Sequence, residues 1–280
     1  MSQLDNQAES SIILSSFNTQ NTKSNELRLK LPLPQFIKDK EVSLANLIMY
    51  FSTPNVSPQY ANQTVSYIFN GTQVDLTLPK GFYSIEDISG YIQFDMKERG
   101  YYLVDQNGNN QYFINIISNQ VYYSATLTCD VVPSVLPVDW TNPNNITLSG
   151  VSPQLKITND NFGNLIGFNV GNYPSSPSNT LYSVNSSKTP VISPSNIYNV
   201  NLNMVNNSQL SLYPNTIYSF IPNVSYGSQQ AVEPRLNLWY PVIPQLYNEI
   251  VVTIRDEQGR DIEILDTNMV VTLLFKNKNK

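Results

Sequence analysis

The chain has 280 residues and a net charge of −5, with 41% hydrophobic and only 13% charged residues. This negative balance excludes a broad nucleic-acid-binding face, and a single cysteine excludes a disulfide-stapled scaffold. Histidine is absent, which removes the Ser-His-Asp and Cys-His nucleophile systems and histidine metal sites.

The start of the chain predicts an arm followed by strands. Residues 1–25 are polar and without periodicity, which predicts a flexible N-terminal arm. ELRLKL (26–31) alternates charge and leucine as a half-buried strand does, and 42–51 is a second, more apolar strand. Asn70-Gly71 between two short apolar runs predicts a tight hairpin.

One convincing helix follows, in SIEDISGYIQFDMKERG (84–100). Ser84 and Asp87 have the spacing of a capping box, and Gly100 suits the position just past the C-terminus. Four apolar residues fall on one face at helical spacing: Ile85, Ile88, Ile92 and Met96.

The stretch TNDNFGNLIGFNVGNYP (158–174) has three evenly spaced glycines: Gly163, Gly167 and Gly171. The pattern is neither GxGxxG nor GxxxxGK[ST], which argues against a nucleotide loop. Its asparagines rule out the apolar segment that a membrane GxxxG contact requires. We therefore expect a short helical turn over 161–166, capped by Asn159 or Asp160 and stopped by Gly167.

Short strands with turn signals make up most of the rest. They are predicted at 101–104, 112–117, 121–128, 146–148, 155–157, 199–204, 215–220, 236–243, 249–255, 261–265 and 270–275. The sequence thus predicts an all-β fold, a single jelly-roll antiparallel β-sandwich over 26–280 with long loops and one or two short helices. Irregular insertions are expected near 133–152 and 172–198.

No catalytic, cofactor-binding or metal-ligating residues are predicted. The acidic pairs that a glycosidase would need are Glu86/Asp87 and Asp95/Glu98 on the predicted helix and Asp256/Glu257 in a predicted hairpin turn. The loop opening at Asp105 resembles a calcium loop, but the glutamate that completes one is missing, so a turn is expected. We expect a chain that is not an enzyme and needs no cofactor.

Targeting signals are not apparent either. The opening MSQLDNQAESS lacks the basic and apolar regions of a signal peptide, and the longest apolar run, about seven residues, is too short to span a membrane. Seven Asn-x-Ser/Thr sequons occur, and the first three start at Asn55, Asn62 and Asn70. In an Asn-rich chain such sequons arise by chance and carry no evidence for glycosylation. We expect no secretion and no membrane insertion.

Four blocks in a fixed order resemble a known family. They are LPKGFYSIEDISGYIQFDM (78–96), FGNLIGF (162–168), IYNVNLNMVNN (197–207) and VTIRDEQGRDIEI (252–264), followed by the terminal strand. The chain resembles the penton (minor capsid) proteins of virophages and of Polinton/Maverick-type virus-like transposons over about residues 25–275. In that family these blocks are scaffold, so there are no catalytic residues to carry over.

The resemblance implies a role in a virion. It implies a homopentamer at each five-fold vertex of an icosahedral capsid, surrounded by a double-jelly-roll major capsid protein and in contact with other minor capsid proteins. Such a subunit is assembled inside the host cell and binds no specific nucleic acid. A jelly-roll carbohydrate-binding or attachment module is the alternative, because 18 tyrosines and the Trp239-Tyr240-Pro241 corner offer rings for sugars.

Overall fold

Short antiparallel strands dominate the protein. The computed structural model describes residues 9–193, 195–207 and 213–278, and in these ranges it has eighteen strands and two α-helices. The strand pairs are antiparallel throughout the described residues. The predicted all-β antiparallel class with two short helices is therefore confirmed.

The chain folds as two compact units, where the sequence predicts one domain over 26–280. Residues 1–53 and 195–280 form the first unit, and 54–194 form the second. Each unit has its own cluster of buried apolar side chains, and the two clusters share no residue. The single-domain prediction is corrected on this ground, because a domain is defined by its own core.

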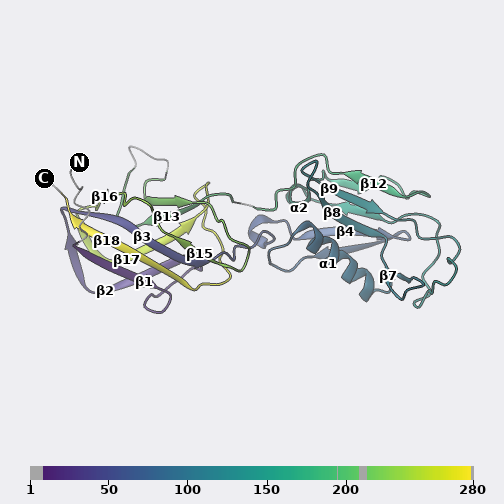
Figure 1. Cartoon of the computed structure of the whole chain (residues 1–280), viewed down its shortest axis with the longest axis horizontal. Coiled ribbons are helices and arrows are strands. Elements are labelled where there is room, and N and C mark those ends of the chain that lie inside the picture. Colours follow the sequence, from purple (N-terminus) through teal and green to yellow (C-terminus); the bar gives the residue numbers. More distant parts are fainter. Residues whose placement is uncertain (1–8, 194, 208–212, 279–280) are drawn as a thin grey trace. The chain divides into compact units, whose positions relative to one another are not determined.

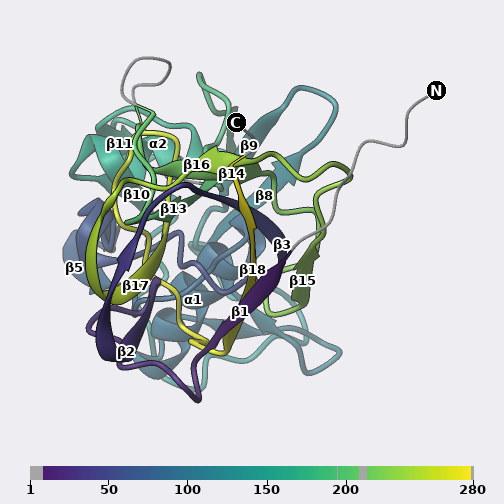
Figure 2. The same cartoon turned by 90° about the vertical axis from the view of Figure 1, so that its left-hand side faces the viewer.

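The first unit is a sandwich of two sheets. One sheet has the order β1 (Ser10–Ser15), β18 (Met269–Asn277), β3 (Lys40–Tyr50), β15 (Gln229–Val232), with β16 (Tyr240–Pro241) also paired to β3. The other has the order β14 (Thr216–Phe220), β13 (Tyr198–Leu202), β17 (Gln245–Arg255), β2 (Glu26–Ile37). Figure 2 shows β1, β18 and β3 on one side and β2 and β17 on the other.

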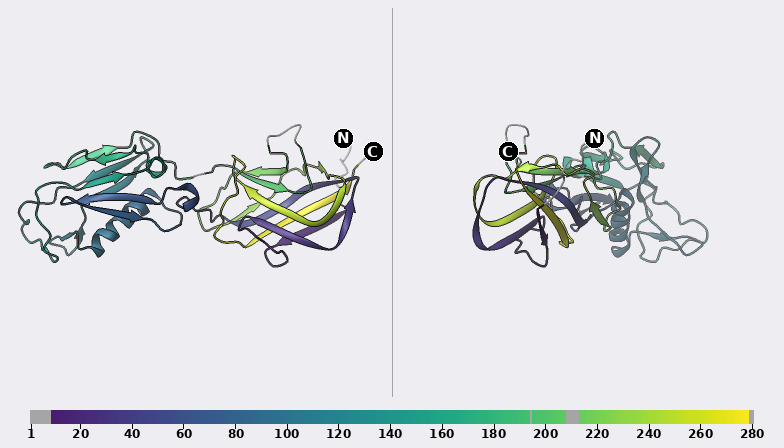
Figure 3. Two further views of the ribbon diagram at one scale, coloured as in Figure 1. Left: turned by 180° about the vertical axis from the view of Figure 1, so that it is seen from behind. Right: turned by 60° about the vertical axis from the view of Figure 1, so that its left-hand side comes forward.

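The order in which the chain visits these strands is that of a jelly roll. β1, β3, β15 and β18 belong to one sheet and β2, β13, β14 and β17 to the other, so each sheet is assembled from distant parts of the sequence. Burial alternates along β17 and β18, which gives each strand one face toward the core. Figure 3 shows the purple and yellow strands interleaved. The jelly-roll prediction holds for this unit, and the second unit is inserted between β3 and β13.

Four connections of the jelly roll meet at one end of the sandwich. The Asn25 side chain donates to the Ile254 carbonyl at 2.7 Å, and Gly227 N–H donates to the Phe51 carbonyl at 2.7 Å. Near the point of insertion, the Ser52 hydroxyl accepts from Asp266 N–H at 2.9 Å, and Ser195 donates to the Glu257 carboxylate at 2.6 Å. The chain therefore leaves and re-enters the jelly roll at the same end.

The predicted N-terminal arm over 1–25 is in part a strand. Residues 10–15 form β1, which pairs with β18 in the register Ser10 to Phe275, whereas 1–8 lie outside the described residues. Leu14 is fully buried and Ile12 packs against the same core. Two inward apolar residues between serines give too short an alternation to predict a strand from sequence.

The second unit has three small sheets and both helices. One sheet has the order β11 (Gly171–Tyr173), β10 (Gln154–Ile157), β4 (Thr64–Phe69), β5 (Thr72–Thr77), another has β12 (Tyr182–Asn185), β9 (Ser124–Cys129), β8 (Ile114–Asn119), and β6 (Leu103–Val104) pairs with β7 (Asn110–Gln111). A 3-10 turn spans Pro58–Tyr60. Figure 1 shows α1 (Ile85–Glu98) and α2 (Asp160–Ile166) in the same unit as β4 and β8.

The local predictions with the clearest physical cause are confirmed. Ser84 and Asp87 form both bonds of the capping box, and α1 buries the predicted face. Asn70 and Gly71 have positive φ and join β4 to β5. Asn159 caps α2: its side-chain oxygen accepts a hydrogen bond from Phe162 N–H at 2.7 Å.

Two predicted strands are wrong, and the predicted insertions are partly ordered. Residues 261–265 form only an isolated bridge between Arg255 and Asp261. Residues 146–148 pair with no strand in the described chain, because the Asn142 amide bonds both the N–H and the carbonyl of Ile146 and takes the place of a partner strand. Region 133–152 is irregular as predicted, whereas 172–198 contains β12 and the end of β11.

Excision of the second unit is expected to leave a folded jelly roll. Replacing 54–194 by a flexible Gly-Ser linker of about eight residues removes no member of the first core. Trp239 is the only tryptophan that remains, and its fluorescence should report one cooperative urea transition. A broad, non-cooperative transition would contradict the independence of the two units.

Candidate functional site

The acidic pair Glu86/Asp87 serves the start of α1. The Asp87 carboxylate accepts from Ser84 N–H at 2.9 Å, and Glu86 accepts from Ser118 N–H at 2.7 Å. The pKa of Glu86 is lowered: hydrogen bonds to Ser118 outweigh the opposing effect of partial burial. Each carboxylate ties the helix start to backbone donors, so the two act as structural acceptors.

The pair Asp95/Glu98 does not converge on a cleft. Asp95 accepts from the Tyr67 hydroxyl at 2.7 Å and from Arg99 at 2.8 Å. Burial and the Asp95 contact raise the pKa of Tyr67. Asp95 therefore links the outer turn of α1 to the core tyrosine of β4.

Asp256/Glu257 are turn residues, as predicted. Asp256 accepts from Gln258 N–H at 2.9 Å and Arg260 N–H at 2.8 Å, while Glu257 accepts from Ser195. The Asp105 loop is the same kind of turn, with Asn107 and Asn109 N–H donating to one carboxylate oxygen at 2.8 and 2.9 Å. These bonds, first that from Asn109, lower the pKa of Asp105. The turn interpretation is confirmed for both loops.

Neither a reactive thiol nor a metal-binding group of side chains occurs among the described residues. Burial raises the pKa of the Cys129 thiol to about 12, so that it stays protonated near neutral pH. Across 9–193, 195–207 and 213–278, no three His, Cys, Asp or Glu side chains are grouped to hold a metal ion. Within the same ranges no helix is long and apolar enough to cross a membrane.

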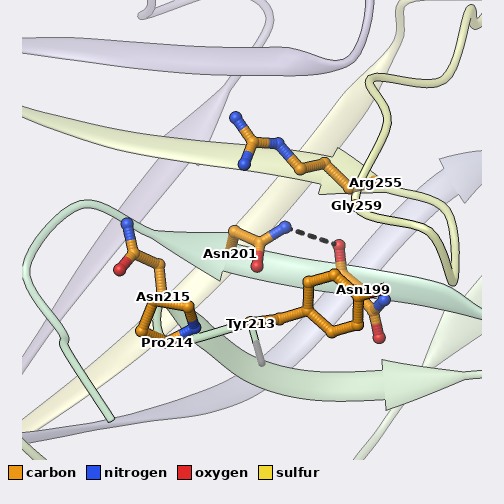
Figure 4. A pocket seen from close by; sticks show the side chains of 7 residues that line it. All are labelled: Asn199, Asn201, Tyr213, Pro214, Asn215, Arg255 and Gly259. Atoms are coloured by element: carbon orange, nitrogen blue, oxygen red, sulfur yellow. Dashed lines mark hydrogen bonds between the residues drawn. The ribbon is translucent and has the colours of Figure 1, made fainter. Parts of the chain in front are cut away.

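A polar pocket of about 160 Å³ lies on the outer face of β13. Figure 4 shows Asn199 and Asn201 on β13, with Arg255 on β17 and Tyr213 before β14. Asn199 donates to the Asp256 carbonyl at 2.9 Å and accepts from Ser219 at 2.7 Å, and Asn201 accepts from Thr216 at 2.7 Å. These two amides therefore hydrogen-bond to groups on or next to the neighbouring strands and help to hold the sheet together. We name Asn199 and Asn201 the polar clamp.

Three large apolar side chains lie uncovered along the edge strand β2 and its neighbour β17. Leu33 is 73% exposed, Phe36 62% and Leu246 59%, and Phe36 is the direct pairing partner of Leu246. We name these three residues the edge patch. Pro32 and Pro34 flank Leu33 and lack the N–H of a ladder. The edge patch therefore offers side-chain contacts along an edge with few backbone donors.

The aromatic corner that the carbohydrate-binding alternative needs is partly covered, and two of the sequon asparagines are buried. Lys276 lies over the Trp239 ring, 4.5 Å from its centroid, and so covers one face of that ring. Three lysines, Lys276, Lys278 and Lys280, end the chain. Lys276 lies inside β18 and also pairs with Glu41 at 3.3 Å, whereas Lys280 lies outside the described residues. Asn55 and Asn62 are buried and bonded to backbone groups.

The edge patch and the polar clamp were not found from sequence. Alternation in ELRLKL predicts the inward leucines correctly, but it says nothing of the outward residues that follow it. Pro32 and Pro34 were the available signal, since a strand that carries prolines belongs at an edge. The clamp had a signal as well: the alternating asparagines of NVNLN (199–203) place polar groups on one face of β13.

Comparisons with known proteins return structural matches only. No protein-family model matches the chain, and no curated protein matches it. The chain is similar to the mavirus penton protein, at 10% identity over 96% of this chain and 99% of that one, with a TM-score of 0.41. It is also similar to a chain of the Sputnik virophage, at 10% identity over 96% and 98%, with a TM-score of 0.37. At scores this low the matches carry no argument about function, which has to rest on the chain's own residues.

Proposed function

We propose that the chain is a structural subunit of a viral capsid, a penton that assembles as a homopentamer. Its place is the five-fold vertex of an icosahedral shell, among copies of a double-jelly-roll major capsid protein. The resemblance of the four sequence blocks first suggests this function. The acidic pairs that would favour an enzyme are engaged in caps, turns and strand contacts instead.

The edge patch on the jelly roll is the observation that carries the proposal. A ring of five needs a head-to-tail contact, in which one surface of a subunit meets a different surface of the next. Leu33, Phe36 and Leu246 supply an uncovered apolar surface for one side of that contact. The low charge of the chain, 13% of residues, reduces the number of ions that association must desolvate.

Light scattering on the purified chain tests the proposal. The expected mass is five times the 31.6 kDa of one chain, with five-fold rings in negative-stain images. The double variant Phe36→Ser/Leu246→Ser should shift the mass to that of one chain, because it removes most of the apolar edge patch.

A matched control comes from the second unit. Val121 is also exposed and apolar, but it lies between β8 and β9, so Val121→Ser should leave the mass unchanged. A one-chain mass at every concentration, with no rings in the presence of a major capsid protein, would count against the penton. An assembly that ignores the double variant would refute the edge patch alone.

A further inference from the structure

The second unit contains a cleft of about 480 Å³ between β7, the end of β9 and the loop that follows β9. Its walls are mainly rings and aliphatic groups: Tyr112, Phe113, Val131, Pro133, Pro137, Trp140 and Leu181. Asp130 N–H donates to the Phe113 carbonyl at 2.9 Å, and Thr141 N–H donates to the Val104 carbonyl at 2.8 Å. These two bonds fix both ends of the loop that carries Trp140.

Two polar side chains of the cleft, Gln111 and Asp130, present acceptor oxygens. Gln111 Nε2 donates to Asp105 at 2.8 Å, which leaves its amide oxygen available. The Asp130 carboxylate has no hydrogen-bond or ion-pair partner among the described residues. Although this carboxylate is accessible to solvent, the apolar walls raise its pKa. The cleft thus holds a negative charge that the protein itself leaves uncompensated.

The charge of the surroundings has the same sign. No lysine or arginine occurs between Arg99 and Lys156, and the second unit has nine acidic and five basic residues. Leu181, which lines the cleft, is exposed, and so are Val135 and Val138 in the loop that carries Trp140. A partner that matches this surface carries positive charge on an apolar stem.

We propose that this cleft binds a basic side chain, lysine or arginine, presented by another protein. The cationic head pairs with Asp130 and lies near the Trp140 ring, where the ring quadrupole attracts a cation. The methylene stem packs on Pro133 and Pro137, and the exposed Leu181 side chain contacts the residues beside it. This inference does not rest on the proposed capsid function. That function is carried by the edge patch of the first unit, whereas all the residues that line the cleft belong to the second unit.

Titration of the full chain with small probes tests the cleft. The chain has two tryptophans, so the variant Trp239→Phe leaves Trp140 as the only one. N-acetyl-arginine amide and N-acetyl-lysine amide should change its emission saturably, and neutral N-acetyl-glutamine amide should bind about tenfold more weakly. If Trp239→Phe is poorly folded, saturation-transfer NMR on the unsubstituted chain measures the binding of the same probes.

Two carboxylate variants separate a binding role from a structural one. Asp130→Asn should weaken both basic probes about tenfold, with a melting temperature equal to or above that of the parent, since it removes an unpaired charge from an apolar setting. Asp139→Asn alters a carboxylate of the same loop that does not line the cleft, and it should change neither quantity.

Four results would overturn the proposal. Equal binding of the glutamine amide would show that the cleft does not discriminate by charge. Unchanged affinity for the basic probes in Asp130→Asn would show that the Asp130 carboxylate does not take part in binding. Choline that binds more tightly than either basic amide would point to a small quaternary ammonium ligand. Saturable galactose or N-acetylglucosamine binding that survives Asp130→Asn would identify a sugar site.

Discussion

Gly163→Ala is expected to destabilise the second unit by about 2–3 kcal/mol, although alanine is the better helix former. Gly163 lies inside α2, and a Cβ there would meet the Phe168 carbonyl oxygen at 2.5 Å and Ile157 at 3.4 Å. The Phe168 N–H also donates to the Gly163 carbonyl at 2.8 Å. The added methyl group must push backbone away, which breaks the bond that closes the helix end.

Gly90→Ala is the matched control, and the opposite sign is expected. Gly90 is an exposed residue inside α1, and a Cβ there meets nothing within 4 Å. The substitution should stabilise by about 0.5–1 kcal/mol, because it lowers the entropy of the unfolded chain. Urea unfolding followed by Trp140 fluorescence in the Trp239→Phe background measures both variants. Equal effects at the two sites would refute the close-packing explanation.

The glycine spacing itself was only partly predictable. That Gly167 stops a helical turn follows from local chemistry, and the structure has it in the left-handed region at φ 83°. That Gly163 must be glycine depends on where Phe168 returns over α2. No local pattern specifies such a return, so the sequence predicts the turn but not the contact that requires the glycine.

The division into two units had no sequence signal of the usual kind. Both units are built from short strands and polar turns, so composition does not change at residues 54 and 194. The register of β3 against β18 and of β13 against β17 joins residues 50 or more positions apart in the sequence. No local feature of a strand specifies its distant pairing partner. The all-β fold class was therefore predictable, whereas the insertion of the second unit was not.

The candidate surfaces show the same limit. Caps and turns around Ser84, Asp105 and Asp256 were predictable because their donors and acceptors are a few residues apart. The cleft at Trp140 needs β7, the end of β9 and Leu181 together, and the edge patch needs β2 beside β17. Sites made by tertiary pairing emerge only once the strand order is known.

Two loops with the same turn give a second sharp prediction: Asp256→Ala should cost far more stability than Asp105→Ala. In both, the aspartate N–H donates to the carbonyl four residues on at 3.0 Å, and a glycine with positive φ follows three residues on. The difference is burial, since Asp256 is only 2% exposed whereas Asp105 is only partly buried.

Removing the Asp256 carboxylate leaves the N–H groups of Gln258 and Arg260 without their acceptor. It also removes the partner of the Arg260 guanidinium, which donates to this carboxylate at 2.6 Å. Water cannot readily replace a buried acceptor, so the expected loss is roughly 3 kcal/mol or more. In Asp105→Ala water reaches the freed donors, and a smaller loss is expected. Each unit has its own reporter, Trp239 for Asp256 and Trp140 for Asp105. Similar losses in the two variants would mean that turn geometry, and not burial, sets the strength of these carboxylates.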